Sequence, residues 1–257
     1  MRRFSWLFLL LAAAIVPVAA QSAVSPESSA SHSVYPVRPD DPHAVYLQPG
    51  SFGGVADGNA DDTAAIQAAI DRVQETTGEG IVFVAEGRYR ISHTIDLWSG
   101  IRLIGYGAHR PVFVLGPNTP GYQQGHGFLG TGQYMLQFAE RRPPRGKPVV
   151  DANEFTFYSG IFNIDFEIGP GNPAAIAIRF HVAQHSFLEH MRFQIGDGRA
   201  ALEDIGNGAI DLDIQGGDYG IVTVRTSPAW QFLLIDSTFT GQRRAAIHTQ
   251  EAGMTLV

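Results

Sequence analysis

The chain has 257 residues, no cysteine and a formal net charge of −7. The negative charge argues against nucleic acid or an anionic membrane surface as a partner, because both would repel it. Neutral sugars remain compatible with this charge, whereas a polyanionic substrate would require a local basic patch or a bound cation. Without disulfides, packing and backbone hydrogen bonds must supply all of the stability.

The first twenty residues have the pattern of a secretory signal. Arg2 and Arg3 precede the apolar stretch 7–16, and small residues follow at 18–20. The apolar stretch is too short to cross about 30 Å of hydrocarbon. We therefore predict a signal peptide at 1–20, secretion to the periplasm or the extracellular space, and no membrane contact after cleavage.

Residues 21–42 are rich in Ser, Ala, Pro and His and show little periodicity. This composition is typical of a flexible segment that leads into a folded domain. We expect residues 43–257 to form one domain, since a chain of that length can bury a single large core.

A single amphipathic helix is predicted near the start of this domain. The Gly, Asp and Asn residues of 52–63 indicate a loop that ends in N-cap residues. We expect the helix to run from Asp62 to about Val73. Its buried face is marked by four apolar residues at helical spacing: Ile66, Ala69, Ile70 and Val73.

Short β-rich segments separated by one or two turn residues follow the helix. They are 81–84, 89–91, 94–97 and 101–104. One helix followed only by short strands excludes the βαβ alternation of a doubly wound fold.

The second half of the chain contains a weak internal repeat of six-residue segments. Each segment alternates inward apolar and outward polar positions, and their last residues lie 27, 21 and 25 positions apart. Such a period in strand-forming sequence is typical of a β-solenoid, whereas a β-sandwich prefers a strand every 8–12 residues with hairpin turns. The segments are 161–166, 188–193, 209–214 and 234–239, which end in Phe166, Phe193, Ile214 and Phe239.

Residues 52–107 resemble the opening of the pectate-lyase-like β-helix superfamily, which includes rhamnogalacturonase-type and epimerase-type proteins. The resemblance implies an all-β fold, a right-handed single-stranded parallel β-helix of the pectin-lyase type, with an N-terminal α-helix that caps its open end. The matching segments are Gly53–Gly58, Asp61–Ile70, Ile81–Val84, Gly87–Ile91 and Ile101–Gly105.

A looser resemblance links later segments to the first β-helix of family 55 glycoside hydrolases, which are exo-β-1,3-glucanases built from two tandem β-helices. The segments are 181–186, 203–208, 215–217 and 230–232. The sequence departs from that family at Val182, where an aromatic residue is usual, and at Trp230-Gln231, where paired glutamines are expected. The resemblance implies that a second β-helix, absent from this chain, completes the site.

Outward carboxylates on stacked coils carry the predicted chemistry. Neighbouring coils place such residues in ladders about 4.8 Å apart, so two carboxylates can pair as general acid and general base. We predict Glu203 and Asp204 as the catalytic pair, lying in a loop-like segment between two coils beside small Gly and Asn residues. One would protonate the glycosidic oxygen of a polysaccharide while the other activates water.

Four further residues are predicted to contact substrate. Gln184 and Ser186 could position water or a sugar hydroxyl, and Tyr219 and Trp230 could stack on pyranose rings. The neighbouring histidines at 181, 185 and 190 do not share the spacing of a zinc site. No metal or other cofactor is therefore expected.

Two alternative functions remain open at this point. A polysaccharide lyase would abstract a proton beside a uronate carboxylate, with Ca²⁺ neutralising the charge and Arg or Lys as base. A non-catalytic carbohydrate-binding or adhesive module would be favoured if Glu203 and Asp204 proved to be buried.

The last residues, 252–257, fall in an apolar β-rich stretch, and no capping pattern follows Phe239. Solenoids need a polar terminal unit, so we expect the sequence to be truncated at its C-terminus. A missing C-terminal half or a second chain would then cover the open end. Alone, the chain is expected to self-associate and to show no glucan hydrolysis.

Overall fold

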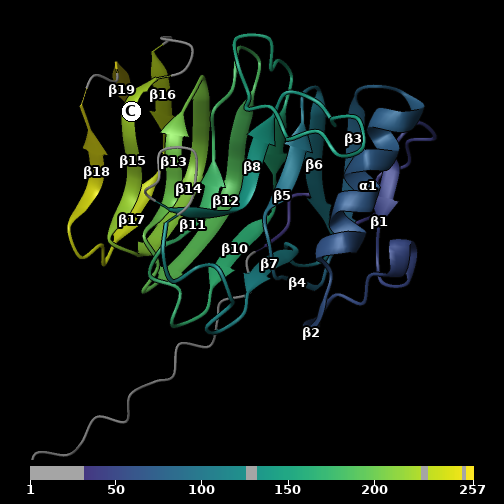
Figure 1. Cartoon of the computed structure of the whole chain (residues 1–257), viewed down its shortest axis with the longest axis horizontal. Coiled ribbons are helices and arrows are strands. Elements are labelled where there is room, and N and C mark those ends of the chain that lie inside the picture. Colours follow the sequence, from purple (N-terminus) through teal and green to yellow (C-terminus); the bar gives the residue numbers. More distant parts are fainter. Residues whose placement is uncertain (1–31, 126–131, 227–230, 251–252) are drawn as a thin grey trace, which may run out of the picture. The chain divides into compact units, whose positions relative to one another are not determined.

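Nineteen strands and one α-helix build the described part of the chain in the computed structural model (Figure 1). The chain divides into two units, Met1–Ala30 and Ser31–Val257. The structure describes residues 32–125, 132–226, 231–250 and 253–257. The predicted signal peptide lies outside the described residues, and so does the first half of the lead-in, residues 21–31. Within the described ranges, no helix has both the length and the apolar character needed to cross a membrane.

The strands are short and follow one another with few intervening residues. The first half contains β1 (Val45–Leu47), the 3-10 turn η1 (Ser51–Gly53), β2 (Asp57–Asp61), α1 (Thr63–Thr76), β3 (Gly80–Ala85), β4 (Arg88–Ile91), β5 (Ile95–Trp98), β6 (Ile101–Tyr106), β7 (Val112–Leu115) and β8 (Gln133–Ala139). The second half contains β9 (Gly160–Phe162), β10 (Asp165–Ile168), β11 (Ala175–Arg179), β12 (Phe187–Gly196), β13 (Ala200–Ile205), β14 (Gly208–Gly216), β15 (Tyr219–Thr226), β16 (Phe232–Ile235), β17 (Thr238–Thr240), β18 (Ala245–Thr249) and β19 (Met254–Leu256).

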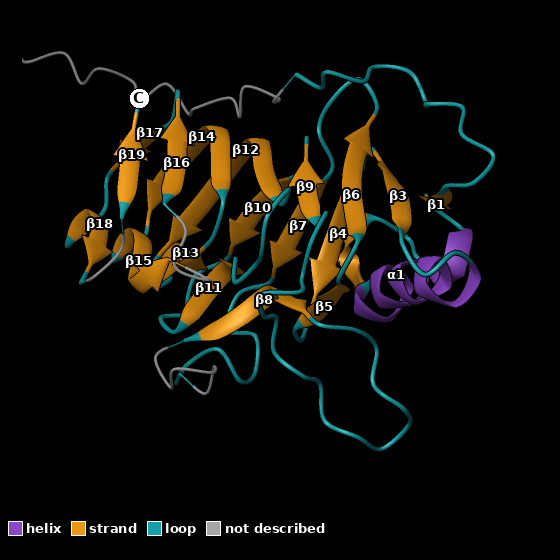
Figure 2. Ribbon diagram, turned by 90° about the horizontal axis from the view of Figure 1, so that it is seen from above, coloured by secondary structure: helices purple, strands orange, loops and turns teal. Residues whose placement is uncertain are grey.

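Parallel pairing between successive coils produces three faces. The first face has the order β1-β3-β6-β9-β12-β14-β16-β19, and the second has the order β2-β4-β7-β10-β12-β14-β17. The long strands β12 and β14 run through both faces. The third sheet is separate and has six strands in the order β5-β8-β11-β13-β15-β18. The fold is therefore the predicted right-handed parallel β-helix, with strands stacked coil upon coil (Figure 2).

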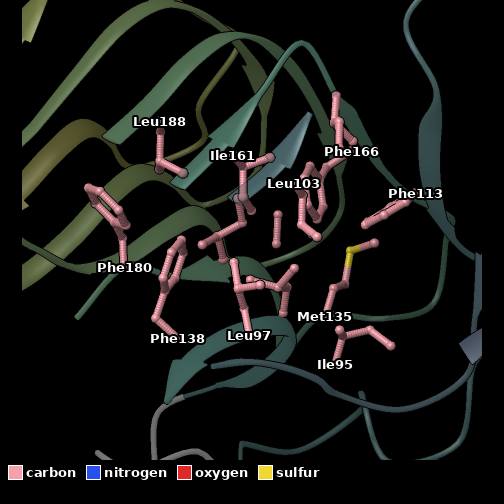
Figure 3. Packing of buried hydrophobic residues seen from close by; sticks show 14 of the residues in the cluster. Ile95, Leu97, Leu103, Phe113, Met135, Phe138, Ile161, Phe166, Phe180 and Leu188 are labelled. Atoms are coloured by element: carbon pink, nitrogen blue, oxygen red, sulfur yellow. The ribbon is translucent and has the colours of Figure 1, made fainter. Parts of the chain in front are cut away.

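The predicted interior ladder is confirmed by the strand register. Phe166 pairs with Phe193, Phe193 with Ile214, and Ile214 with Phe239. The ladder also extends towards the N-terminus, from Phe166 to Phe113 and then to Tyr89. The rings of Phe113 and Tyr89 pack edge to face, with their centres 5.9 Å apart. Figure 3 shows Phe113 and Phe166 within the same packed interior as Leu103 and Ile161. One continuous apolar core therefore holds the coils together, as expected for a solenoid without disulfides.

Each predicted six-residue repeat turns a corner rather than forming one straight strand. Its third residue has a left-handed backbone, which lets the chain pass from the first face to the second. These residues are Asn163, His190, Asp211 and Asp236, with φ of 60°, 55°, 54° and 48°. Asp, Asn and His tolerate this conformation better than other non-glycine residues. In the preceding coil, Gly105 occupies the position equivalent to Asn163. A Cβ atom at Gly105 would lie only 2.0 Å from the carbonyl oxygen of Asn163, so a larger residue would clash there.

The helix α1 covers the first coil, as predicted, and ends three residues later than expected, at Thr76. Its buried residues include Ile66, Ile70 and Val73, which join the main core. The N-cap residue Asp62 makes no side-chain bond to the helix; its carboxylate accepts hydrogen bonds from the backbone of Val55 and Ala56 instead. The expected loop at 52–63 contains strand β2, because Asp57 and Asp61 pair with β4.

Residues 33–35 of the expected lead-in lie against the first face. Asn163 Nδ2 donates to Ser33 Oγ at 2.7 Å, and Asn163 Oδ1 accepts from the backbone of Val34 at 3.2 Å. The ring of Tyr35 lies 5.7 Å from that of Phe162. Residues 33–35 therefore pack along the corner where the chain turns at Asn163 from the first face to the second.

Candidate functional site

The outer side of the third sheet carries a row of polar residues that runs across the strands. In register, Asp96 of β5 pairs with Gln137 of β8, which pairs with Arg179 of β11, and Arg179 pairs with Glu203 of β13. Neighbouring members of this outer row are about 4.8 Å apart, the ordinary strand separation. The row therefore places side chains from four successive coils along one line.

Arg179 is the centre of a buried cluster on this row. Only 1% of the residue is exposed, yet its guanidinium contacts two carboxylates. Nε and Nη2 donate to Asp204 Oδ2 at 3.1 and 2.9 Å, and Nη2 donates to Asp151 Oδ2 at 3.0 Å. Nη1 also donates to Asp151 Oδ1. A buried guanidinium is stable only with such partners, because removing its charge from water costs several kcal/mol.

A local irregularity of β13 brings Asp204 to Arg179. Asp204 has a left-handed backbone, with φ of 48°, and the pairing of β13 with β15 shifts register between Glu203 and Ile205. Such bulges redirect one side chain out of the regular alternation. Glu203 and Asp204 thus lie in a strand rather than in the loop-like segment expected from sequence, and they occupy different environments although they are adjacent.

Asp151 reaches the cluster from the long connection that follows β8. An isolated antiparallel bridge between Asp151 and Ala139 returns this connection to the third sheet. His181 Nδ1 lies 2.9 Å from Asp151 Oδ2. Because a carboxylate can only accept, Nδ1 carries the proton and Nε2 is the remaining ring nitrogen. The side chains of His181 and Asp151 are 23% and 22% exposed, so this end of the cluster reaches solvent.

The ionisation of Asp151 is set by these partners. Burial by itself would raise the pKa of Asp151, but the hydrogen bonds from His181 and Arg179, together with the charge of the guanidinium, outweigh burial and hold the pKa below its usual range. Asp151 is therefore a stable carboxylate that orients His181.

Glu203 lies entirely inside the cluster. It is 0% exposed, and its Oε1 accepts a hydrogen bond from the hydroxyl of Tyr134 at 2.7 Å. Burial, and then the charge of Glu203, raise the pKa of Tyr134, so this phenol stays protonated and remains a donor. The Arg179 guanidinium lies 5.9 Å from the centre of the Tyr134 ring. In the described structure a sugar has no access to Glu203.

The other predicted substrate contacts fall in several environments. Ser186 is buried and bridges two segments: its Oγ accepts from the backbone of Ser159 and donates to the carbonyl of Thr156. Gln184 is half-buried. Tyr219 lies on the outer side of β15 between Arg199 and Arg244, which are 5.8 and 5.9 Å from its ring centre. Trp230 lies outside the described residues.

An exposed aromatic pair close to Ser186 was not predicted. Tyr158 and His185 stack at 4.9 Å with their planes 7° apart, and both are exposed. His185 follows His181 by four residues, so the Cα atoms of the two histidines lie within about 14 Å of each other. Aromatic rings at such a position can pack against sugar rings.

Sequence reasoning also missed Arg179 and Asp151. Arg179 interrupts the apolar stretch 174–180, and a charge at that place was a usable signal. Asp151 gave none, because it lies 28 residues before Arg179 in a segment without periodicity. Among the described residues, no group of three or more His, Asp or Glu side chains is arranged to hold a metal ion.

The coil architecture and the polar outer row define a parallel β-helix of the pectate-lyase-like kind. Residues 50–257 match the family described as Rhamnogalacturonase A/epimerase, pectate lyase-like, and the chain belongs to this family.

Two curated relatives and one solved structure illustrate the range of this similarity. A probable glucan endo-1,3-beta-glucosidase of Arthroderma benhamiae is 26% identical over 196 residues, which are 69% of this chain and 21% of that protein. Mannuronan C5-epimerase AlgE3 of Azotobacter vinelandii is 41% identical over 71 residues, which are 25% of this chain and 4% of the epimerase. The chain thus spans about a fifth or less of these relatives. A Parabacteroides merdae protein described as a glycosyl hydrolase superposes with a TM-score of 0.55 at 17% identity, covering 80% of this chain and 94% of that one, which shows the fold alone.

Proposed function

We propose that the chain is the β-helix of a secreted glycoside hydrolase that acts on a polysaccharide such as a β-1,3-glucan. The single observation that carries the proposal is the cluster on the outer side of the third sheet, where Asp204, Asp151 and His181 gather around Arg179. The name of the Arthroderma benhamiae relative agrees with this reaction class. Residues 1–20 support secretion by their sequence alone.

The cluster provides the two functions that glycoside hydrolysis requires. His181, oriented by Asp151 through Nδ1 and protonated on both ring nitrogens, would donate its Nε2 proton to the glycosidic oxygen, and solvent would then reprotonate the neutral imidazole that is left. Asp204, whose side chain is 13% exposed, would activate water as general base. Of the two carboxylates predicted from sequence, Asp204 is therefore the better candidate for contact with substrate. Glu203 would fix Tyr134 and hold the row in place.

At this cluster, the lyase alternative is disfavoured. A lyase needs a free Arg or Lys as base and a cation to neutralise a uronate carboxylate. Arg179 is 1% exposed and already bound to Asp151 and Asp204, so it is not available for either task.

A binding module is a second candidate, and one observation favours it. Glu203 is 0% exposed and Asp204 is 9% exposed, so both predicted catalytic carboxylates are buried or nearly so. In that case the Tyr158–His185 pair, rather than the Arg179 cluster, would carry the affinity for sugars.

Asp204→Asn and a matched control test the proposal. Asp236 has the same φ of 48° as Asp204 but lies exposed at a corner of the coil, so Asp236→Asn is the control. Both variants are assayed in the whole encoded protein. We expect release of reducing ends from a β-1,3-glucan to fall by about 100-fold or more in Asp204→Asn, the usual cost of losing an acid–base group, and to stay unchanged in Asp236→Asn.

Three outcomes would overturn the hydrolase proposal. Equal turnover in both variants would remove Asp204 from the mechanism. Ultraviolet-absorbing unsaturated ends in the product would establish the lyase reaction instead. Glucan binding by affinity electrophoresis with no turnover by the whole encoded protein would establish the binding module.

A further inference from the structure

A cleft of about 320 Å³ opens beside the first strand of the third sheet. One wall is formed by α1 and β5, and the other by the connection after β8. The lining residues that carry the argument are Asp96, Trp98, Arg142, Arg145 and Lys147. The proposed hydrolytic mechanism uses none of them.

The wall formed by the connection is strongly basic. Residues 140–147 contain one acidic and four basic residues in a chain whose net charge is −7, and Lys147 is the single lysine of the whole sequence. This concentration of positive charge is the local basic patch that an anionic ligand would require.

Arg142 fixes the connection against α1. Its Nε lies 3.1 Å from Asp71 Oδ2, its Nη1 contacts Glu75, and its backbone N–H donates to Gln74 Oε1 at 2.7 Å. Arg142 is thereby neutralised by carboxylates of the protein. Arg145 and Lys147 form no ion pair with any residue in the described ranges, and both are exposed. Their charges are therefore available to a ligand.

The cleft also contains one carboxyl group, that of Asp96. Asp96 Oδ1 accepts a hydrogen bond from Gln137 Nε2 at 2.6 Å. Burial, with a smaller contribution from the charge of Asp71, raises the pKa of Asp96 above its usual value. Trp98 is only 3% exposed and donates its Nε1 hydrogen to Asp71, so the cleft provides charge rather than an aromatic platform.

We propose that this cleft binds an anionic substituent, a carboxylate or a sulfate, on the same polysaccharide chain that reaches the Arg179 cluster. Asp96 and Arg179 belong to one outer row and are two strand separations, about 10 Å, apart. A chain lying across the strands would thus place a charged sugar in the cleft and an unmodified linkage at Asp204. The identity of the carrier as a polysaccharide rests on the proposed function; the anion site itself does not.

Chemical labelling of Lys147 tests the cleft directly, because no other lysine competes for the reagent. The rate of amine acylation at Lys147 is measured by mass spectrometry with three probes: a polygalacturonate oligosaccharide, a sulfated β-1,3-glucan oligosaccharide and the neutral β-1,3-glucan oligosaccharide. The α-amino group serves as the internal reference. We expect at least one acidic probe to slow labelling about tenfold at low salt, with the protection lost at high salt, and the neutral probe to give none. The acidic probe that protects identifies the anion.

Affinity measurements with paired variants complete the test. Arg145→Gln combined with Lys147→Gln removes two charges from the cleft, and Arg88→Gln combined with Arg90→Gln removes two from the second face. We expect the first pair to weaken binding of the protecting acidic oligosaccharide about tenfold, equivalent to 1.4 kcal/mol, and the second pair to leave it unchanged. Neutral glucan hydrolysis should be the same in both.

Two results would overturn the anion site. One is an acylation rate of Lys147 that no probe slows, and the other is an equal loss of affinity for the acidic oligosaccharide in both variant pairs. Either result leaves glucan hydrolysis by the parent chain unaffected, so it is distinguishable from a failure of the proposed function. Acidic-probe protection without any glucan hydrolysis by the whole encoded protein would retain the anion site and remove the hydrolase.

Discussion

Two carboxylates near the outer row, Asp96 at one of its ends and Asp151 on the connection after β8, show how the partner of a carboxylate changes its pKa. Asp96 and Asp151 both lie on the outer side of the third sheet, and burial opposes the ionisation of both. Asp151 has a guanidinium and an imidazole as partners, and its pKa is lowered. Asp96 has the amide of Gln137 and a nearby carboxylate, and its pKa is raised. The two pKa values therefore shift in opposite directions, and the Arg179 guanidinium is a partner that Asp151 has and Asp96 lacks.

Removing the Arg179 guanidinium should have the largest effect on the free energy of unfolding. Arg179→Met leaves Asp151 and Asp204 without their shared partner in a buried place, and we expect a loss of about 3–5 kcal/mol in the free energy of unfolding, the usual cost of breaking a buried ion pair. Arg244→Met, at a side chain that is 64% exposed, should cost less than about 0.5 kcal/mol. Urea denaturation of both variants measures the difference. Equal losses would mean that the Arg179 cluster contributes no more than a surface charge.

Asp151→Asn should show how the stability contributed by the Asp151 carboxylate changes with pH. The pKa of Asp151 is lower in the folded chain than its ordinary value of 3.8, so its ionised form stabilises the fold above that pH, and the contribution is lost as the pH falls through the folded pKa. We expect the variant to be less stable by about 1.5–3 kcal/mol at pH 7, as for a hydrogen bond to a charged group. The difference should vanish in strong acid. A difference that grows on acidification would contradict the assignment.

Tyr134→Phe should cost about 1–3 kcal/mol, because it leaves Oε1 of the buried Glu203 without its hydroxyl donor. Thermal unfolding detects such a loss readily. Tyr158→Phe provides the control, since the exposed Tyr158 ring would keep its stack on His185. If both variants unfold at the parent temperature, the Tyr134–Glu203 contact does not stabilise the cluster.

Asp96→Asn should have the smallest effect on stability, and it should stabilise the fold, whereas the preceding substitutions destabilise it. Because the pKa of Asp96 is raised in the fold, its protonated form stabilises the chain below its ordinary pKa, and this contribution is lost as the pH rises through the folded pKa. The amide keeps an acceptor for Gln137 and carries no charge. We expect the melting temperature at pH 7 to rise by at most about 2–4 °C, the equivalent of 1 kcal/mol in a domain of this size, and the gain to disappear in acid. A fall at pH 7 would show that Asp96 is stabilised as an anion.

The fold could be read from sequence because its signals are local and repeated. Phe166, Phe193, Ile214 and Phe239 recur at the length of one coil, and register confirms their ladder. The corners could not be read in the same way. His190 and Asp211 look like outward positions of a straight strand, and only their positive φ reveals the turn.

The candidate site was predictable only in part, for a related reason. Asp204 was found because it adjoins a resembling segment, but adjacency could not show that the bulge separates it from the buried Glu203. Asp151 and His181 meet across 30 residues of chain. Contacts of that kind follow from how the coils stack, and no local pattern encodes them.

The central claim is that the outer side of the third sheet receives the polysaccharide. Hydrogen–deuterium exchange with and without a β-1,3-glucan oligosaccharide tests it most directly, because the three faces of the coil give different peptides. We predict slower exchange in residues 149–158 and 179–186, around Asp151, His181 and the Tyr158–His185 pair, and unchanged exchange in residues 192–195 and 213–215 of the second face. Protection of the second face with none at 149–158 or 179–186 would contradict the claim.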